Sequence, residues 1–273
     1  SLQENSYSKQ INSVFGAVNL GWRNLVYLDA TIRGDKSSTL PVNNNTYVYP
    51  SVSGSFVFSE LLKRNDMLPY GKMRMSWAQV GSDTDPYKLG LVYSKSKFTY
   101  PGYTIGYIDN EVIPNKDLKP TKTNSFEVGF ETKFLNQRLG LDFTYYNQIS
   151  RNQIIGMASS WTTGYPYRLI NAGEIQNQGI EVALNTRPVQ AGDFSWDLNL
   201  NFSKNNNKVR ELTDNMDMFE LEKASWLDVQ VAAKVGENFG SIVGPDFKRN
   251  ADGQVLIDPA TGLPMYDKSN HVL

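Results

Sequence analysis

The alternation of apolar and polar side chains is most regular between Leu118 and Ile155. One parity carries the apolar residues Phe126, Val128, Phe130 and Phe134, and the other carries Ser125, Glu127, Glu131 and Lys133. After a break at residues 135–137, Leu139, Leu141, Phe143 and Tyr145 are set against Arg138, Asp142 and Thr144. A period of two predicts a strand with one apolar face, and a tight break between two such runs predicts a hairpin. Each arm has about ten residues, the length of a strand that crosses a bilayer at a tilt of roughly 45°.

The same pattern recurs along the chain, so the sequence predicts about eight strands. The other six cover residues 11–22, 26–33, 51–58, 72–77, 180–185 and 194–203. Short breaks follow the first, fifth and seventh strands, at residues 22–24, 135–137 and 188–192. Long irregular stretches follow the second, fourth, sixth and eighth, at residues 34–45, 82–122, 150–176 and from 205 to the end. Within the last stretch, Asp252-Gly253 and Thr261-Gly262 predict small hairpins.

Alternation alone does not separate a soluble antiparallel sandwich from a membrane barrel, because both have one apolar and one polar face. Three further features favour a barrel wall. Apart from an intermediate connection after the third strand, the loops alternate between short and long, as the periplasmic turns and external loops of outer-membrane barrels do. The polar faces mix Ser, Asn, Thr, Asp and Glu and carry little Lys. Aromatic residues gather near the turn ends of the strands, at Trp22, Phe134, Phe194 and Trp196.

A barrel wall predicts which way each parity faces. Lipid contact is expected for the apolar residues Phe126, Val128, Phe130, Leu139, Leu141, Phe143, Leu198 and Leu200. The interior is expected to receive Glu127, Glu131, Asp142, Asp197 and Asn199. The short turns should lie on the periplasmic side, and loops 82–122 and 150–176 on the cell surface. Because Glu127 and Glu131 lie two pleats apart on one strand, we interpret them as a solvated wall and not as an acid–base pair.

The composition excludes several kinds of chemistry. The 273 residues carry 27 Lys and Arg against 28 Asp and Glu, so charge predicts no nucleic-acid partner. No cysteine is present, and the one histidine, His271, cannot build a metal site or a triad alone, so we expect it in a loop. No apolar run approaches the ~20 residues of a membrane helix, and the opening SLQENSYSKQ does not match a signal peptide. We expect no catalytic residue, no cofactor and no metal.

Several stretches resemble one family. LKPTKTNSFEVGFETKF followed by NQRLGLDFTYYNQISRNQI is similar to the barrel hairpin of SusC/RagA-type TonB-dependent outer-membrane transporters. The resemblance continues through NAGEIQNQGIEVALNTRPV, DFSWDLNLNFSKNNNKVREL and VGENFGSIVGPDF with DGQVLIDPATGLP. Upstream, FGAVNLGWRNLVYLDATIRGDKSST and YPSVSGSFVFSE are similar to earlier strands of the family. The resemblance covers nearly the whole chain, with its stretches in the same order, although no single motif is diagnostic by itself.

The resemblance implies an all-β fold, an antiparallel section of a large transmembrane β-barrel with about eight of an expected 22 strands. Residues 1–204 are then barrel strands with short periplasmic turns and long external loops, and residues 205–273 are a long external loop region. The family also has a plug domain and a TonB-interacting segment, which this sequence does not show. We therefore expect an internal section whose first and eighth strands pair with strands outside it.

For function, the resemblance implies energised import of an oligosaccharide or a peptide across the outer membrane of a Gram-negative cell. The implied partners are outer-membrane lipid, a SusD-like surface lipoprotein, and TonB through a plug region. Candidate ligand-binding residues are the loop aromatics Tyr93, Phe98, Tyr100, Tyr103, Tyr107, Trp161, Tyr165 and Tyr167, because flat rings with a polar edge stack on sugar faces. The same rings could instead pack the loops together or contact the lipoprotein. Two alternatives stay open: a soluble or surface carbohydrate-binding β-sandwich, and a passive porin-like barrel.

Overall fold

The computed structural model describes residues 6–62, 67–90, 93–108, 112–165, 167–213, 216–224 and 228–272. Strands dominate, and the chain divides into two compact units, residues 1–206 and 207–273. No helix among the described residues is long and apolar enough to span a membrane. The prediction of an all-β, antiparallel fold is confirmed.

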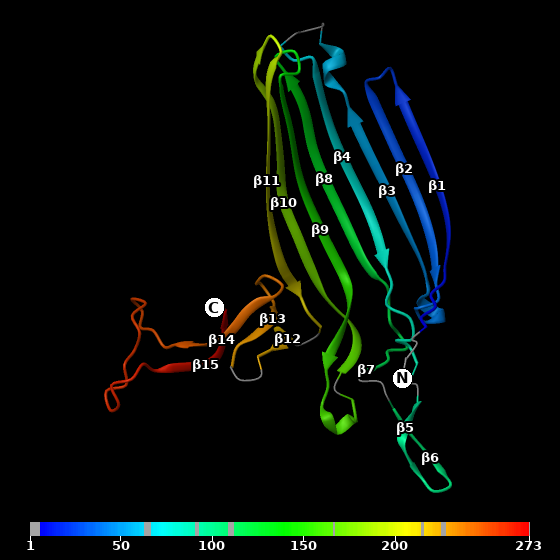
Figure 1. Cartoon of the computed structure of the whole chain (residues 1–273), viewed down its shortest axis with the longest axis vertical. Coiled ribbons are helices and arrows are strands. Elements are labelled where there is room, and N and C mark those ends of the chain that lie inside the picture. Colours follow the sequence, from blue (N-terminus) through cyan, green and yellow to red (C-terminus); the bar gives the residue numbers. More distant parts are fainter. Residues whose placement is uncertain are drawn as a thin grey trace. The chain divides into compact units, whose positions relative to one another are not determined.

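The first unit is built on one nine-stranded sheet, whose long strands lie side by side in the order of the chain (Figure 1). All its long strands are antiparallel, and only the short β7 (Val112–Ile113) pairs in parallel, with β10. The long strands are β1 (Ile11–Trp22), β2 (Val26–Ser37), β3 (Thr46–Phe56), β4 (Tyr70–Ser82), β8 (Thr121–Phe134), β9 (Leu139–Ala158), β10 (Tyr167–Ala191) and β11 (Phe194–Glu211).

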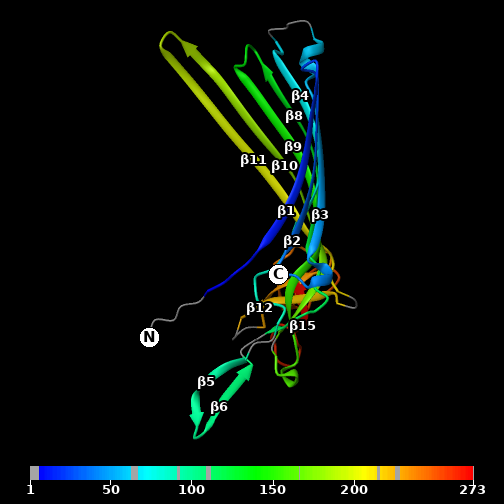
Figure 2. The same cartoon turned by 90° about the vertical axis from the view of Figure 1, so that its right-hand side faces the viewer.

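The sheet is a single curved layer with two open edges, as the view from the side shows (Figure 2). Strands β1 and β11 stand at opposite ends of the strand order and do not pair with each other. A closed eight-stranded barrel would require that pairing. The first and last strands thus do not close on each other, and their pairing with strands outside these residues stays a prediction.

The short connections are tight turns with left-handed backbone. Arg23 and Asn24 have φ of 51° and 53°, and the Leu25 N–H donates to the Trp22 carbonyl at 2.9 Å. Positive φ at both central residues gives a turn whose twist matches the flanking strands. Residues 135–137 also have positive φ and confirm the predicted break there. The predicted turn at 188–192 is wrong in extent, because β10 continues as far as Ala191. The turn itself begins at Gly192, which has a φ of 57°.

Several predicted loops are strand instead. The β9–β10 ladder extends from the Leu139–Thr186 pair to the Ala158–Tyr167 pair and omits only the step at Asn152 and Gly173, so most of the predicted loop 150–176 is wrong. The predicted loop 34–45 is shorter than expected, because β2 continues to Ser37. The connection that remains contains the 3-10 helix η1 (Val42–Asn44). Backbone pairing needs no apolar face, and apolar and polar residues do not alternate regularly in these extensions, so the sequence pattern does not reveal them. The other 3-10 turns are η2 (Phe58–Leu61) and η3 (Trp161–Thr163).

The predicted loop 82–122 also contains ordered structure. Strands β5 (Tyr93–Tyr100) and β6 (Tyr103–Ile108) form a separate two-stranded hairpin, with an irregular register between Lys95 and Thr99. The hairpin and β7 together interrupt what the sequence shows as forty irregular residues.

The two faces of the large sheet differ as predicted. In-register neighbours Met75, Val128, Tyr145 and Ile180 form an apolar row across four strands. The outer residues stay uncovered, with Met73 51% and Leu200 52% exposed. A soluble sandwich would bury such a face against a second layer. Contact of this face with lipid itself stays a prediction.

Buried apolar packing in the first unit lies beside the long connections. Leu118 is fully buried, and Leu40, Tyr47 and Leu169 pack with it. Leu118 precedes β8, Leu40 and Tyr47 lie on either side of the start of β3, and Leu169 lies near the start of β10. The cluster therefore joins the loop ends of three strands.

The second unit is an antiparallel sheet and not the irregular segment predicted beyond Lys204. Its strands are β12 (Met218–Lys223), β13 (Gln230–Lys234), β14 (Ser241–Phe247) and β15 (Tyr266–Val272), and β11 itself runs on to Glu211. His271 therefore lies in a strand and not in a loop. Both predicted small hairpins are confirmed by the bridges between Arg249 and Val255 and between Ile257 and Pro264.

Candidate functional site

The polar face of the sheet is organised by an arginine that reaches across a whole strand. The Arg74 guanidinium on β4 donates to both Asp142 carboxylate oxygens on β9, at 2.9 and 2.6 Å, and to the Thr144 hydroxyl at 2.5 Å. The intervening strand β8 carries Gly129 directly opposite Arg74. A Cβ at Gly129 would lie 3.0 Å from Arg74 Nε and 2.7 Å from the Phe143 carbonyl oxygen. The glycine thus leaves the space that the guanidinium occupies.

A tyrosine repeats this arrangement two strands along the sheet, on β9. Tyr146 on β9 lies over Gly179 on β10, where a Cβ would meet the phenol oxygen at 2.7 Å. Its hydroxyl donates to Asn205 Oδ1 on β11 at 3.0 Å, and Asn205 in turn donates to Asn177 at 3.3 Å. Beside it lies an open polar depression of about 370 Å³, lined by Glu127, Thr144, Tyr146, Gln148, Asn177, Glu181 and Asn205. This surface offers hydrogen bonds to a hydrated ligand.

Glu127 and Glu131 lie on that same wall. Their in-register partners are Tyr146 and Asp142 on β9, so both carboxylates face the polar side of the sheet. This placement is that of a wall exposed to water, and the described residues contain no group of three or more His, Cys, Asp or Glu side chains that could hold a metal ion.

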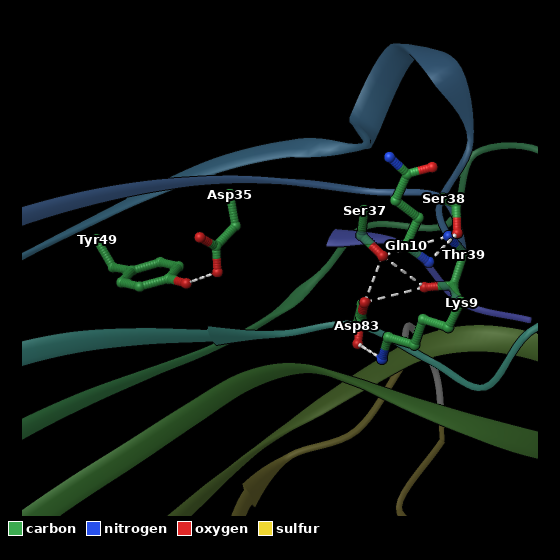
Figure 3. A network of polar contacts seen from close by, with 8 residues as sticks. All are labelled: Lys9, Gln10, Asp35, Ser37, Ser38, Thr39, Tyr49 and Asp83. Carbon is green, nitrogen blue, oxygen red and sulfur yellow. Dashed lines mark hydrogen bonds and ion pairs between the residues drawn. The ribbon is translucent and has the colours of Figure 1, made fainter. Parts of the chain in front are cut away.

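A second polar network ties together three segments at the loop end of the sheet (Figure 3). The Asp83 carboxylate, just beyond β4, accepts from Lys9 Nζ at 2.6 Å, from the Thr39 hydroxyl at 3.0 Å and from the Ser37 hydroxyl. Burial alone would raise the pKa of Asp83, but these hydrogen bonds and the Lys9 charge outweigh it and hold the pKa below its ordinary value of 3.8. The ionised carboxylate fixes the first residue of the long connection between β4 and β8.

The other end of that connection is fastened by Asn171 on β10. Its amide donates to the Lys119 carbonyl and accepts from the Lys119 N–H, each at 2.7 Å, as a neighbouring strand would. The same amide donates to the Asn152 carbonyl at 3.0 Å. Asn152 and Gly173 both have positive φ, 56° and 72°, in the same step of the β9–β10 ladder. With β7 and the buried Leu118, these contacts hold residues 112–120 against β10.

Between the two anchors lies the aromatic hairpin. Tyr100 and Tyr103 stand directly opposite each other at its tip and are 68% and 74% exposed. Tyr167 begins β10 beside Val112, and Tyr165 is half-buried behind η3. Among the described side chains, no ring contact joins these two groups. The structure thus places Tyr100 and Tyr103 opposite each other, and the described rings show no contact between them and Tyr165 or Tyr167.

The remaining predicted aromatics are placed only by their backbone. Tyr93 and Phe98 belong to β5, Tyr107 to β6 and Trp161 to η3. Their side chains lie outside the described part of the chain. Ligand binding by any of the eight aromatics stays a prediction.

The only histidine stands in a polar group on β15 that does not have the geometry of a triad. The Ser269 hydroxyl lies 2.8 Å from His271 Nε2, and Asp267 Oδ2 lies 3.3 Å from the same nitrogen. A triad needs the acid on the other ring nitrogen, so that the near one is left to take the serine proton. Asp267 instead accepts from the Ser269 hydroxyl and N–H, and these bonds lower its pKa to about 2.

Sequence reasoning missed the residues that hold this surface in place: Arg74, Asp83 and Asn171. Each acts over a long separation, 74 residues for Lys9 with Asp83 and 52 for Lys119 with Asn171, so no local pattern marks them. Gly129 does carry a signal, because glycine within a strand often marks a close approach by another group.

Comparison with known proteins gives consistent results. Residues 1–237 match the family described as TonB dependent receptor-like, beta-barrel. The chain is 26% identical over 255 residues to TonB-dependent receptor P3 of Formosa agariphila, covering 90% of this chain and 25% of the relative. It is 27% identical over 209 residues to TonB-dependent receptor SusC of Bacteroides thetaiotaomicron, covering 74% of this chain and 21% of the relative. The chain thus spans about a quarter of the length of these relatives.

A solved structure of the RagAB peptide transporter matches the fold. The TM-score is 0.80 at 20% identity, with 97% of this chain and 28% of that chain covered. The soluble-sandwich alternative is therefore wrong. The family match, the antiparallel open sheet and its two contrasting faces agree, and the chain belongs to the TonB-dependent receptor β-barrel family.

Proposed function

We propose that this chain is part of the wall of an outer-membrane importer for large nutrients. Its family consists of outer-membrane receptors and transporters. The observation that carries the proposal is the open sheet with an apolar outer face and a polar inner face bridged by Arg74 and Tyr146. An inner wall of hydroxyls, amides and carboxylates lets a hydrated solute pass without burying unpaired polar groups.

The substrate class that we propose is an oligosaccharide or a peptide. Support comes from the names of the relatives, one a SusC receptor and one a peptide transporter. A SusD-like lipoprotein on the cell surface and TonB, acting through a plug outside this chain, complete the proposed machinery. We propose no covalent chemistry, since neither the Glu127–Glu131 pair nor the His271 group is arranged for it.

Within this chain, ligand capture is assigned to the exposed hairpin tip. Tyr100 and Tyr103 lie opposite each other at the tip, and the connection that carries the hairpin is held at its two ends by Asp83 and Asn171. Paired rings offer a flat apolar surface with a polar edge, which suits a sugar ring or a peptide side chain.

Uptake by the full-length receptor tests the proposal. Cells expressing it are supplied with labelled oligosaccharides and labelled peptides, with and without a protonophore. Energised import predicts uptake that the protonophore abolishes, and Tyr100→Ala with Tyr103→Ala is expected to lower uptake several-fold. Replacement of Tyr7, an exposed tyrosine before β1, serves as the control. Uptake that persists without energy would support the passive porin alternative instead.

A further inference from the structure

The outer face of the sheet changes character toward the long loops. Moving along the strands from the apolar row of Met75, the next two rows acquire amides. The set comprises Gln79, Asn124, Asn147, Gln176 and Gln178, which we call the amide belt. Gln79 donates to Asn124 at 2.9 Å, and Gln176 donates to Asn147 at 2.7 Å. In-register pairing places all five on the same face as Val128 and Tyr145.

Charged residues follow immediately beyond the amide belt. Lys122, Arg151 and Glu174 are directly opposite one another on β8, β9 and β10. Arg151 is paired with Glu174 at 2.6 Å, which neutralises both. Lys122 is exposed and has no ion-pair partner within the described residues. Along the strands toward the long loops, the outer face therefore carries first apolar side chains, then amides, and then a row with net positive charge.

A shallow depression of about 250 Å³ lies where the apolar face meets the amide belt. Its lining combines the apolar Tyr145 and Ile180 with Gln178, Lys204 and Asn206, and with backbone at Gly179. Lys204 is exposed, and no ion pair engages it in the part of the chain that the structure describes. A long apolar stem with a charged end lets a lysine place its ammonium at a membrane interface.

We propose that this depression binds the phosphorylated headgroup of a membrane lipid. The Lys204 ammonium pairs with the phosphate, the Gln178 and Asn206 amides bind headgroup hydroxyls, and the first acyl methylenes lie on Tyr145 and Ile180. The proposal rests on the apolar face lying in the outer membrane and not on what the receptor imports.

The occupant follows from the position and the charge of the site. The depression continues the apolar face that the membrane covers, at the level where that face turns polar, so headgroups are what it meets. An unpaired lysine beside neutral amides, with no carboxylate in the lining, selects an anionic group. A second receptor copy that met the depression with the same face would present the same lysine and repel Lys204.

Lipid binding by the full-length receptor tests the site. The receptor is purified, stripped of lipid in uncharged detergent and titrated with lipopolysaccharide, phosphatidylglycerol or phosphatidylcholine, with retained lipid measured by native mass spectrometry. Lys204→Ala is expected to weaken binding of the anionic lipids about tenfold and to leave phosphatidylcholine unchanged. Lys72→Ala removes the same charge from the inner face, opposite Glu131, and is the matched control.

Each outcome bears on the proposal. Preference for lipopolysaccharide over phosphatidylglycerol would support recognition of phosphate together with headgroup sugars, and equal binding of the two would support recognition of phosphate alone. Equal binding of all three lipids, no effect of Lys204→Ala, or a dimer that buries the depression would each overturn it. Energised uptake by the Lys204→Ala receptor separates a failure here from a failure of the import proposal.

Discussion

At the scale of single residues, two glycines on the inner face set the path of longer side chains. Gly129 and Gly179 lie beneath Arg74 and Tyr146, which bridge to the second strand along. Each bridge crosses one strand and fixes the spacing of three. Removal of the Asp142 carboxylate would leave the Arg74 guanidinium without this hydrogen-bond partner, and removal of the Tyr146 hydroxyl would break its bond to Asn205.

Gly129→Ala is expected to destabilise the folded receptor by about 1–3 kcal/mol, because the added methyl overpacks against backbone and guanidinium. The loss of folded barrel with rising temperature in detergent, followed on gels, measures this. Gly140→Ala is the control, since its Cβ would have only an ordinary contact, 3.7 Å to the Asn185 carbonyl oxygen. Equal stability of the two variants would contradict the close approach at Gly129.

The hydrogen bonds of Asp83 predict that the start of the connection between β4 and β8, residues 83–90, responds to pH. Its folded pKa is lowered, so the stabilisation is fully present above the ordinary value of 3.8 and is lost as pH falls through the folded value. Faster hydrogen exchange in residues 83–90 is expected below pH 3.8 in the native receptor. Asp83→Asn should exchange faster already at pH 7 and show little change on acidification. Identical profiles for the two proteins would exclude this role.

At the scale of elements, the strands themselves could be read from the sequence, but their ends could not. Alternation located the middle of every long strand because one face there is apolar and the other polar. The outer halves of β9 and β10 carry polar residues on both faces, so only the backbone ladder defines them. The Asp83 and Asn171 anchors join distant segments and leave no periodic trace.

A charge on the outer face of a central strand should disturb the barrel strongly. Phe130→Arg is expected to cost about 2–4 kcal/mol if residue 130 lies near mid-bilayer, because the guanidinium would enter hydrocarbon. Glu131→Arg, one residue along on the polar face, is the matched control. Folding into lipid vesicles under increasing urea measures both variants. A greater loss for Glu131→Arg would reverse the facing of the whole sheet.

The turns and loops should label from opposite sides of the membrane. A cysteine at Asn136, in the tight turn after β8, is expected to stay unmodified by an impermeant reagent on intact cells. A cysteine at Thr162, in η3 between β9 and β10, is expected to react. Because the chain has no native cysteine, each label reports one site within it. Reaction at Asn136 without permeabilisation would invert the topology.

At the scale of the whole molecule, the open edges of β1 and β11 are the dominant fact. Each carries a row of backbone groups without a strand partner in this sheet, and in hydrocarbon every such group costs several kcal/mol. We expect both edges to pair with other strands of the complete receptor. A structure of that receptor checks this directly, and a closed barrel formed by these 273 residues alone in vesicles would contradict it.

The paired left-handed residues Asn152 and Gly173 have an evolutionary consequence. They stand at the step where the β9–β10 ladder leaves its regular section, and the hydrogen bonds of Asn171 and Thr121 converge on the Asn152 carbonyl. Beyond that step, residues can be gained or lost in cross-strand pairs without shifting the register below it. Homologous receptors can therefore differ in the length of this β9–β10 extension while the barrel strands stay the same. The extension can thus evolve at a different rate from the barrel wall.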